Sequence, residues 1–394
     1  MNNPDVFVVS AMRTAIGSYG GSLKNLPLSE LATVAVSAAI KKADIDPHQV
    51  GHVVMGNVIP TEPRDAYLSR VAALNAGVPK EVPAFNVNRL CGSGLQALVS
   101  AAQCLWLGDT EVAIAAGAES MSRAPYVQAQ TRWGARMGDI ETIDYMLGIL
   151  HDPFQKMHMG ITAENIAQRF GISRGEQDLL AMESQRRALH AIVHGHFTEQ
   201  IIAVEIHERQ AVRQFAIDEH PRDISLEQLS RMKPAFLDHG SVTPGNASGL
   251  NDGAAALLLA TSAALRSNSA LKPMARVVAH AHAGVEPEFM GLGPIPATKL
   301  ALKRAGLSIT DIDVIESNEA FAAQACAVAK ELDFDPAKVN PNGSGISLGH
   351  PVGATGAIIA TKAIHELHRT GGRYALATMC IGGGQGIAVI FERA

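Results

Sequence analysis

The chain has 394 residues, of which 47% are hydrophobic and 18% charged, enough for two or three domains with large cores. Its net charge of −5 argues against the basic surface that nucleic-acid binding requires. No apolar run reaches the roughly 18 residues of a membrane span, and the first residues carry no basic leader. The four cysteines form no C-x-x-C pair, so we expect a cytoplasmic protein without a metal site or a disulfide framework.

The first 120 residues predict alternating strands and helices. Buried strands are expected at 6–9, 52–59, 82–87 and 111–116. Amphipathic helices are expected at 28–43, at 67–76 and from Leu95 to Leu105. This alternation is typical of a mainly parallel α/β sheet with helices on both faces.

From about residue 121 to 245 the pattern is more polar and less regular. Ser173 with Glu176, and Ser225 with Gln228, form two capping boxes, each of which marks the start of a helix. We interpret this region as an inserted loop domain that covers the sheet and shapes a binding site, because insertions of this length usually carry function. A plain surface excursion is the alternative.

After a linker at 267–272, the second half repeats the alternation of strands and helices predicted for the first 120 residues. A strand at 254–260 is expected before the linker. After it, strands are expected at 275–281, 312–315, 374–379 and 387–391, and helices at 297–305 and from Asn318 onward. The helix after Asn318 resembles in design the helix after Cys91. We therefore interpret the chain as a duplicated α/β unit.

Cys91 lies where a strand turns into a helix, and Gly92 and Gly94 follow closely. A thiol at a helix N-terminus meets free N–H groups and the positive end of the helix dipole. Both favour the thiolate, which is the reactive form of cysteine. A buried structural thiol in a tight turn is equally compatible with these residues.

Three further positions carry candidate chemistry. His350 ends a glycine-rich loop before a proline at a helix start, Cys380 precedes a turn of glycines, and Asn318 lies at a helix start. A structural histidine, a core thiol and an ordinary N-cap are the respective alternatives. Together with Cys91 they suit thioester chemistry, in which one thiolate holds an acyl group and a second thiol exchanges a proton with a carbon acid. The amide and the imidazole would polarise carbonyl oxygens.

Four motifs carry a resemblance to the thiolase family of acyl-CoA C-acyltransferases, and most of all to its bacterial short-chain β-ketothiolases and acetyl-CoA acetyltransferases. They are Asn-Arg-Leu-Cys-Gly-Ser-Gly (88–94), Asn-Glu-Ala-Phe (318–321), Gly-His-Pro (349–351) and Cys-Ile-Gly-Gly-Gly (380–384). The resemblance spans essentially the whole chain. It implies thiolase-like duplicated α/β units in α-β-α-β-α layers. An N-terminal domain, 1–268, would contain the inserted loop domain at about 121–245, and a C-terminal domain would cover 272–394.

The resemblance also implies a role for each catalytic position. Cys91 would be the acylated nucleophile. His350 would take its proton and help bind the thioester oxygen of the second substrate, and Asn318 would hold the water that completes that oxyanion hole. Cys380 would move the proton at the reacting carbon. The N–H groups of Cys91 and Gly382 would form the hole for the acyl-enzyme oxygen.

The same resemblance implies that coenzyme A and acyl-CoA are substrates, with no cofactor bound permanently. The expected contacts are His158, Met159, Arg222, Phe236, Ser248, Leu250, Met290, Ala320 and Phe321. Two departures from the family pattern fall beside them, since 219–225 is about one residue short and Pro244 stands where close relatives commonly have alanine. The segment 121–143, with Trp133, resembles a tetramer-forming loop, which implies a homotetramer.

Two other classes of protein remain as alternatives. Ketosynthases and hydroxymethylglutaryl-CoA synthases resemble thiolases in fold, but their sites lack the second cysteine, which is Cys380 here. A non-catalytic CoA-binding relative would have lost Cys91 or His350. The two other cysteines, Cys104 and Cys326, lie within helical patterns and are expected in the core. The sequence leaves open the acyl chain length and the physiological direction.

Overall fold

The computed structural model describes residues 4–207 and 211–394, so segment 1–3, where a leader would begin, lies outside the described residues. The main strands are β1 (Val6–Thr14), β3 (His52–Gly56), β4 (Ala84–Val87), β5 (Val112–Ser120), β11 (Asn251–Thr261), β12 (Ala275–Gly284), β13 (Val314–Ser317), β14 (Tyr374–Ile381) and β15 (Gln385–Arg393). They are ordered β13-β14-β15-β12-β1-β11-β5-β3-β4. Two short strands, β2 (Gly17–Ser18) and β8 (Ile201–Ile202), pair with β11 and β1.

The expectation of a mainly parallel sheet is wrong. Parallel pairing joins β3 to β4 and β5, β13 to β14, and the short β8 to β1. Antiparallel pairing joins β11 to β1 and β5, and β15 to β12 and β14. The physical reason lies in the connections between strands. β15 follows β14 through a tight turn at Gly383 and Gly384, both with positive φ, and not through a helical crossover, so the two strands run antiparallel.

The strand order shows the duplication. From the centre outward, β1-β11-β5-β3 in one half corresponds to β12-β15-β14-β13 in the other, with the same sequence of pairing directions. The halves meet through the short antiparallel contact of Phe7 with Arg276 and of Val8 with Ala275. The α/β duplication inferred from the sequence is therefore present.

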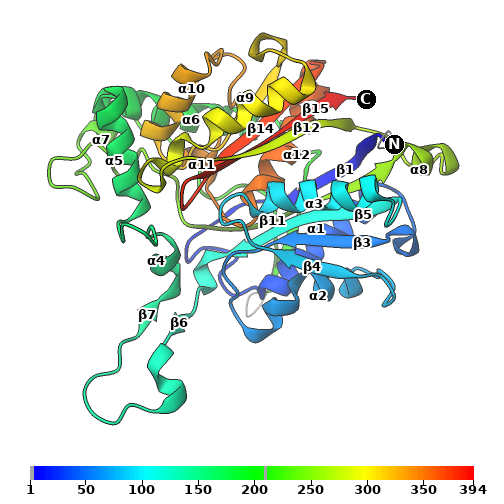
Figure 1. The fold of residues 1–394 in the computed structure, drawn as a ribbon, viewed down its shortest axis with the longest axis horizontal. Coiled ribbons are helices and arrows are strands. Elements are labelled where there is room, and N and C mark those ends of the chain that lie inside the picture. The colour runs from blue at the N-terminus through cyan, green and yellow to red at the C-terminus, as the bar shows by residue number, and fades with distance from the viewer. Residues whose placement is uncertain (1–3, 208–210) are drawn as a thin grey trace.

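The long helices lie in three layers around the two half-sheets (Figure 1). On the outer face of the first half lie α1 (Leu28–Lys42) and α2 (Leu68–Asn75), and on that of the second half lie α9 (Pro294–Ala305) and α10 (Ala322–Glu331). Between the half-sheets lie α3 (Ser93–Leu107) and α12 (Thr355–Thr370), which pack against each other. The chain thus has the expected α-β-α-β-α layers.

The central helix α3 is mostly apolar apart from a narrow polar face at Gln96, Ser100 and Gln103, and Leu95, Leu98 and Leu105 are fully buried. Among the described residues, the window Leu90–Leu107 is the one helical stretch long and apolar enough to cross a membrane, and 61% of that window is buried inside the protein. Because α3 packs against β3, β5 and α12, its hydrophobicity is accounted for by the core.

The inserted segment covers one end of the second half. Its elements are β6 (Tyr126–Val127), β7 (Ile143–Asp144), α4 (Tyr145–Ile149), α5 (Met159–Phe170), α6 (Arg174–Val193), β9 (Val204–His207), β10 (Val212–Phe215) and α7 (Leu226–Ser230). Both expected capping boxes are present, at the starts of α6 and α7. The helices α5 and α6 pack on α10, whereas β6 and β7 form an arm that projects from the body (Figure 1).

The remaining helices are short. They are α8 (Ser262–Ser267) and α11 (Gly345–Leu348), with 3₁₀ turns at Pro47–Gln49, Pro63–Tyr67, Met121–Arg123, Ala129–Trp133, Pro287–Leu292 and Ile309–Asp311. The expected linker therefore begins where α8 ends.

Candidate active site

The two central helices cross in close contact at their first turns. A methyl group at Gly94 of α3 would lie 2.4 Å from the backbone nitrogen of Ala357, and one at Gly356 of α12 would lie 2.2 Å from that of Leu95. The crossing therefore requires glycine on both helices. Cys91 lies two residues before α3 and His350 lies five residues before α12, so the crossing of the two helices brings these chain segments together.

Two expectations about these elements need correction. In the duplicated fold the counterpart of α3 is α12, since each lies between the half-sheets, and the helix after Asn318 is not that counterpart. That helix, α10, begins only at Ala322, so Asn318 follows the end of β13 and does not cap a helix. The turn at 318–321 is held instead by pairing with a neighbouring loop, where the Ser248 N–H donates to the Ala320 carbonyl. Likewise α12 begins at Thr355, five residues after His350.

A largely apolar cavity of about 290 Å³ lies at this crossing. Cys91, His350, Cys380 and Gly382 line it. Eight of the expected CoA contacts also line it, namely His158, Met159, Phe236, Ser248, Leu250, Met290, Ala320 and Phe321. The structure thus brings residues from both halves and from the insert around one space.

The other two expected residues lie outside the cavity lining. Asn318 is fully buried and reaches the site through His350. Arg222 is exposed, and its Nη2 lies 3.4 Å from the carbonyl oxygen of Pro244, a cavity residue. Arg222 therefore lies beside the cavity mouth.

Much of the cavity wall was not anticipated. The unpredicted lining includes Val58, Leu90, Met121, Leu147, Ile149, Leu150, Ala235, Thr243, Ala247 and Val352. Apolar residues of this kind look the same in a sequence whether they pack in a core or face a cavity. Leu90 is distinctive in the structure because its φ of +45° is rare for a bulky side chain, but the sequence carries no signal of it.

The tautomer of His350 follows from its hydrogen bonds. Its Nδ1 lies 2.6 Å from the Thr355 Oγ1, and the Thr355 hydroxyl donates in turn to the Pro351 carbonyl at 2.9 Å. The Thr355 oxygen must therefore accept a hydrogen from Nδ1, which leaves Nε2 unprotonated. Burial lowers the pKa of His350 to about 4, so the imidazole is neutral at physiological pH and can act as a base.

Asn318 faces the basic nitrogen of His350. Its Nδ2 lies 3.5 Å from Nε2, while its backbone N–H donates to the Thr378 carbonyl at 3.0 Å. Its Oδ1 is buried and has no hydrogen-bond partner among the described residues. An unsatisfied buried amide oxygen is costly, so this atom has capacity for a water molecule.

Both candidate reactive thiols are neutral at rest. Burial raises the pKa of Cys91 more than hydrogen bonds from the N–H groups of Gly382 and Cys91 lower it, and the nearby Glu119 raises it further. The expectation that the helix N-terminus favours a Cys91 thiolate is therefore wrong, because desolvation outweighs it. Burial also raises the pKa of Cys380, and Cys91 adds to that effect.

A buried carboxylate links the two sides of the site. Glu119 accepts hydrogen bonds from the backbone N–H groups of Val58, Ile59 and Gly353 and from the Asn57 amide, at 2.8 to 3.1 Å. Burial raises its pKa to about 8, while these four donors favour the ionised form. Glu119 thereby ties the loop after β3 to the loop between His350 and α12. Glu119 was not predicted from the sequence as a site residue.

The remaining candidate groups lie apart from this chemistry. Cys104 and Cys326 lie within α3 and α10 and are only partly buried, rather than deep in the core as expected. Burial raises the pKa of Cys326 to about 12. Within 4–207 and 211–394, no group of three or more His, Cys, Asp or Glu side chains is arranged to hold a metal ion.

Comparison with known proteins gives consistent matches along the chain. Residues 6–263 match the family model described as "Thiolase, N-terminal domain", and residues 271–393 match "Thiolase, C-terminal domain". The beta-ketothiolase BktB of Cupriavidus necator is 60% identical over 391 residues, and an acetyl-CoA acetyltransferase of Pseudomonas aeruginosa is 46% identical over 392, each with 99% of both chains covered. The crystal structure of human mitochondrial 3-ketoacyl-CoA thiolase in complex with CoA has a TM-score of 0.96 at 43% identity, with 99% of this chain and 98% of that chain covered.

Proposed function

Because this chain belongs to the thiolase family, we propose that it is an acyl-CoA C-acyltransferase that works through an acyl-Cys91 intermediate. It would cleave 3-oxoacyl-CoA with CoA, or in reverse condense acetyl-CoA with a short acyl-CoA. One observation carries the proposal, namely that two neutral thiols and one neutral imidazole lie at a single apolar cavity.

The first half of thiolysis begins at Cys91. His350 Nε2 accepts the Cys91 proton, and the thiolate attacks the 3-oxo carbon of the substrate. The N–H groups of Cys91 and Gly382 stabilise the resulting oxyanion. When the carbon–carbon bond breaks, the acyl group stays on Cys91 and the enolate of acetyl-CoA leaves. The protonated His350 and a water held by Asn318 stabilise the enolate oxygen.

Cys380 completes the proton transfers. Its neutral thiol gives a proton to the enolate carbon, which yields acetyl-CoA. The Cys380 thiolate then takes the proton of an incoming CoA thiol, and the CoA thiolate attacks acyl-Cys91 to release acyl-CoA. His350 returns its proton to Cys91. A raised pKa suits both roles of Cys380, since the thiol is neutral at rest and its thiolate is a strong base.

Cys380→Ser tests the assignment of the second thiol. The variant is expected to keep acyl transfer from acetyl-CoA to Cys91 but to lose cleavage of the carbon–carbon bond, because serine is too weak an acid and base for this step. Cys104→Ser, in α3 and outside the cavity lining, is the matched control. Full thiolysis by Cys380→Ser would contradict the assignment. A kcat/KM series from short to medium 3-oxoacyl-CoA would identify the chain length accepted.

The projecting arm supports a second part of the proposal, that the chain forms a homotetramer. Trp133 and Met137 on the arm are 90% and 95% exposed, which is unusual for large apolar side chains. We expect these side chains to be buried against a second copy. Light scattering is expected to give the mass of a tetramer, and Trp133→Ser with Met137→Ser is expected to reduce it to a dimer. A wild-type monomer at micromolar concentration would contradict the proposal.

A further inference from the structure

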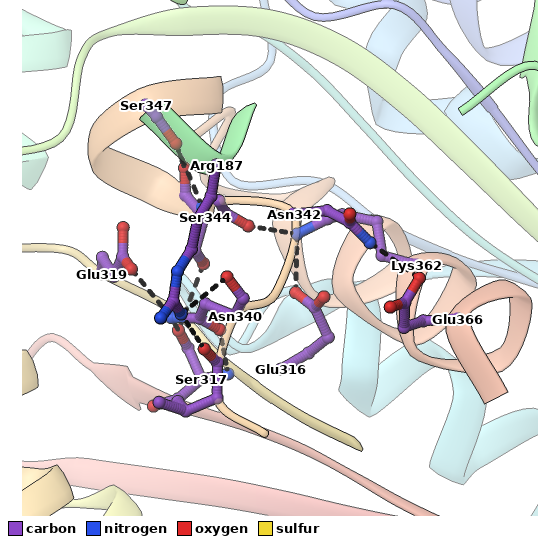
Figure 2. A network of polar contacts seen from close by, with 12 residues as sticks. Arg187, Glu316, Ser317, Glu319, Asn340, Asn342, Ser344, Ser347, Lys362 and Glu366 are labelled. Carbon is purple, nitrogen blue, oxygen red and sulfur yellow. Dashed lines mark hydrogen bonds and ion pairs between the residues drawn. The ribbon is translucent and has the colours of Figure 1, made fainter. Parts of the chain in front are cut away.

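A buried polar network holds the residues on either side of Asn318, and Figure 2 shows its members Ser317, Glu319 and Asn340. Asn340 is at its centre, because its side chain binds both neighbours of Asn318. Its Oδ1 accepts the Ser317 N–H at 2.9 Å, and its Nδ2 donates to the Ser317 carbonyl at 2.8 Å and to Glu319 Oε1 at 2.9 Å. Asn340 is 5% exposed, so water does not compete for these bonds.

The other oxygen of Glu319 connects the network to the inserted segment. Glu319 Oε2 accepts the hydroxyl of Ser184, on α6, at 2.6 Å. Ser184 Oγ also lies 2.8 Å from Ser347 Oγ, in the short helix α11 that precedes His350. The turn that carries Asn318 is therefore held from the second half and from the insert at once.

The amide of Asn318 is also confined directly. A methyl group at Gly345 would lie 2.8 Å from Asn318 Oδ1 and 2.7 Å from the Glu319 carbonyl oxygen. The segment 340–345 thus packs directly against the side chain of Asn318. Asn340 itself has a φ of +46°, a left-handed conformation that asparagine tolerates better than most residues.

We propose that Asn340 and Glu319 are positioning residues that fix Asn318 against His350 Nε2. This inference rests on the proposed function, in which Asn318 stabilises the enolate oxygen while other groups stabilise acyl transfer to Cys91. Removing one oxyanion-hole donor typically costs roughly 100- to 1,000-fold in kcat. Displacing one costs less, so we expect a roughly 10- to 100-fold loss, confined to the carbon–carbon bond step.

Asn340→Gly is the most direct test, because glycine adopts the left-handed backbone and removes only the side-chain bonds. We expect thiolysis kcat to fall roughly 10- to 100-fold, while acetyl transfer from acetyl-CoA to Cys91 changes by less than about threefold. Ser184→Ala removes one bond to Glu319 and is expected to shift the ratio of the two rates in the same direction by about threefold. If Asn340→Gly does not fold, Ser184→Ala tests the positioning role by itself.

Asp65→Ala is the matched control for lost buried bonds. Asp65 Oδ2 is buried and accepts three hydrogen bonds, from Thr61 N, Thr61 Oγ1 and Glu62 N, outside the cavity lining. It is expected to leave the ratio of the two rates unchanged. Equal loss of both rates in Asn340→Gly and Ser184→Ala, or no loss in either, overturns the positioning role. A wild-type protein that forms no acetyl-Cys91 refutes the proposed function itself, and is thereby distinguishable.

Discussion

Thr355→Val tests how the fold sets the tautomer of His350. The Thr355 oxygen accepts the Nδ1–H of His350 at 2.6 Å, and valine keeps the shape of the side chain without that acceptor. A buried donor without a partner costs about 1–3 kcal/mol. The tautomer with a basic Nε2 should therefore become less favourable, and both acetyl transfer to Cys91 and thiolysis should slow by about 5- to 150-fold.

The same helix provides a matched control. Thr361 is fully buried in α12, and its hydroxyl has no partner among the described residues. Thr361→Val should therefore leave activity unchanged and raise the free energy of unfolding by up to about 1–3 kcal/mol. Single-turnover acetylation at pH 7 to 8 and urea unfolding measure the two effects. Equal rates for Thr355→Val and wild type, or an equal loss in Thr361→Val, would refute the assigned tautomer.

Further predictions concern packing and charge. Gly94→Ala should destabilise the fold by at least about 1–3 kcal/mol and reduce activity, because its methyl group would meet α12. In contrast, Gly175→Ala, at the start of α6, would bring its methyl group only into ordinary contact with Ser173 Oγ at 3.9 Å and should be neutral or stabilising in urea unfolding. The acid limb of thiolysis kcat/KM should lie near pH 4, because burial lowers the pKa of His350 to about 4, and a limb at pH 6.5 would contradict this. Because the pKa of His350 is lower in the folded than in the unfolded protein, neutral His350 contributes fully to the free energy of unfolding above about pH 6.5. That contribution is lost as the pH falls through about 4. Lys362→Met should cost about 3–5 kcal/mol in urea unfolding, because it leaves Glu316 buried without its 2.6 Å ion pair, and a cost below 1 kcal/mol would contradict this.

The candidate reacting groups could be predicted from the sequence because each lies near the end of a regular element. Cys91 and His350 precede α3 and α12, Asn318 follows β13, and Cys380 is the second-last residue of β14, with turn residues nearby in each case. Their convergence was predicted, but its geometry could not be read from the sequence, because it depends on the crossing of α3 and α12. Gly94 and Gly356 can be read from the sequence, but the backbone atoms that each of them contacts cannot.

Burial explains the largest error in the predicted chemistry. A helix N-terminus is visible in a sequence, whereas the desolvation that raises the pKa of Cys91 depends on what packs around it. The same holds for Glu119 and Asn340, whose partners lie 60 or more and 21–23 residues away in the chain. Sheet direction was misjudged because a strand that returns through a tight turn has the same apolar pattern as one that follows a crossover.

Acyl transfer to Cys91 is the central claim, and peptide mapping by mass spectrometry tests it most directly. The protein is mixed briefly with acetyl-CoA, quenched in acid and digested, and the peptides are mapped. The account predicts one acetyl group per chain, on the peptide that holds Cys91, and none in Cys91→Ala. An unmodified Cys91, or an acetyl group on Cys104, Cys326 or Cys380 instead, would contradict it.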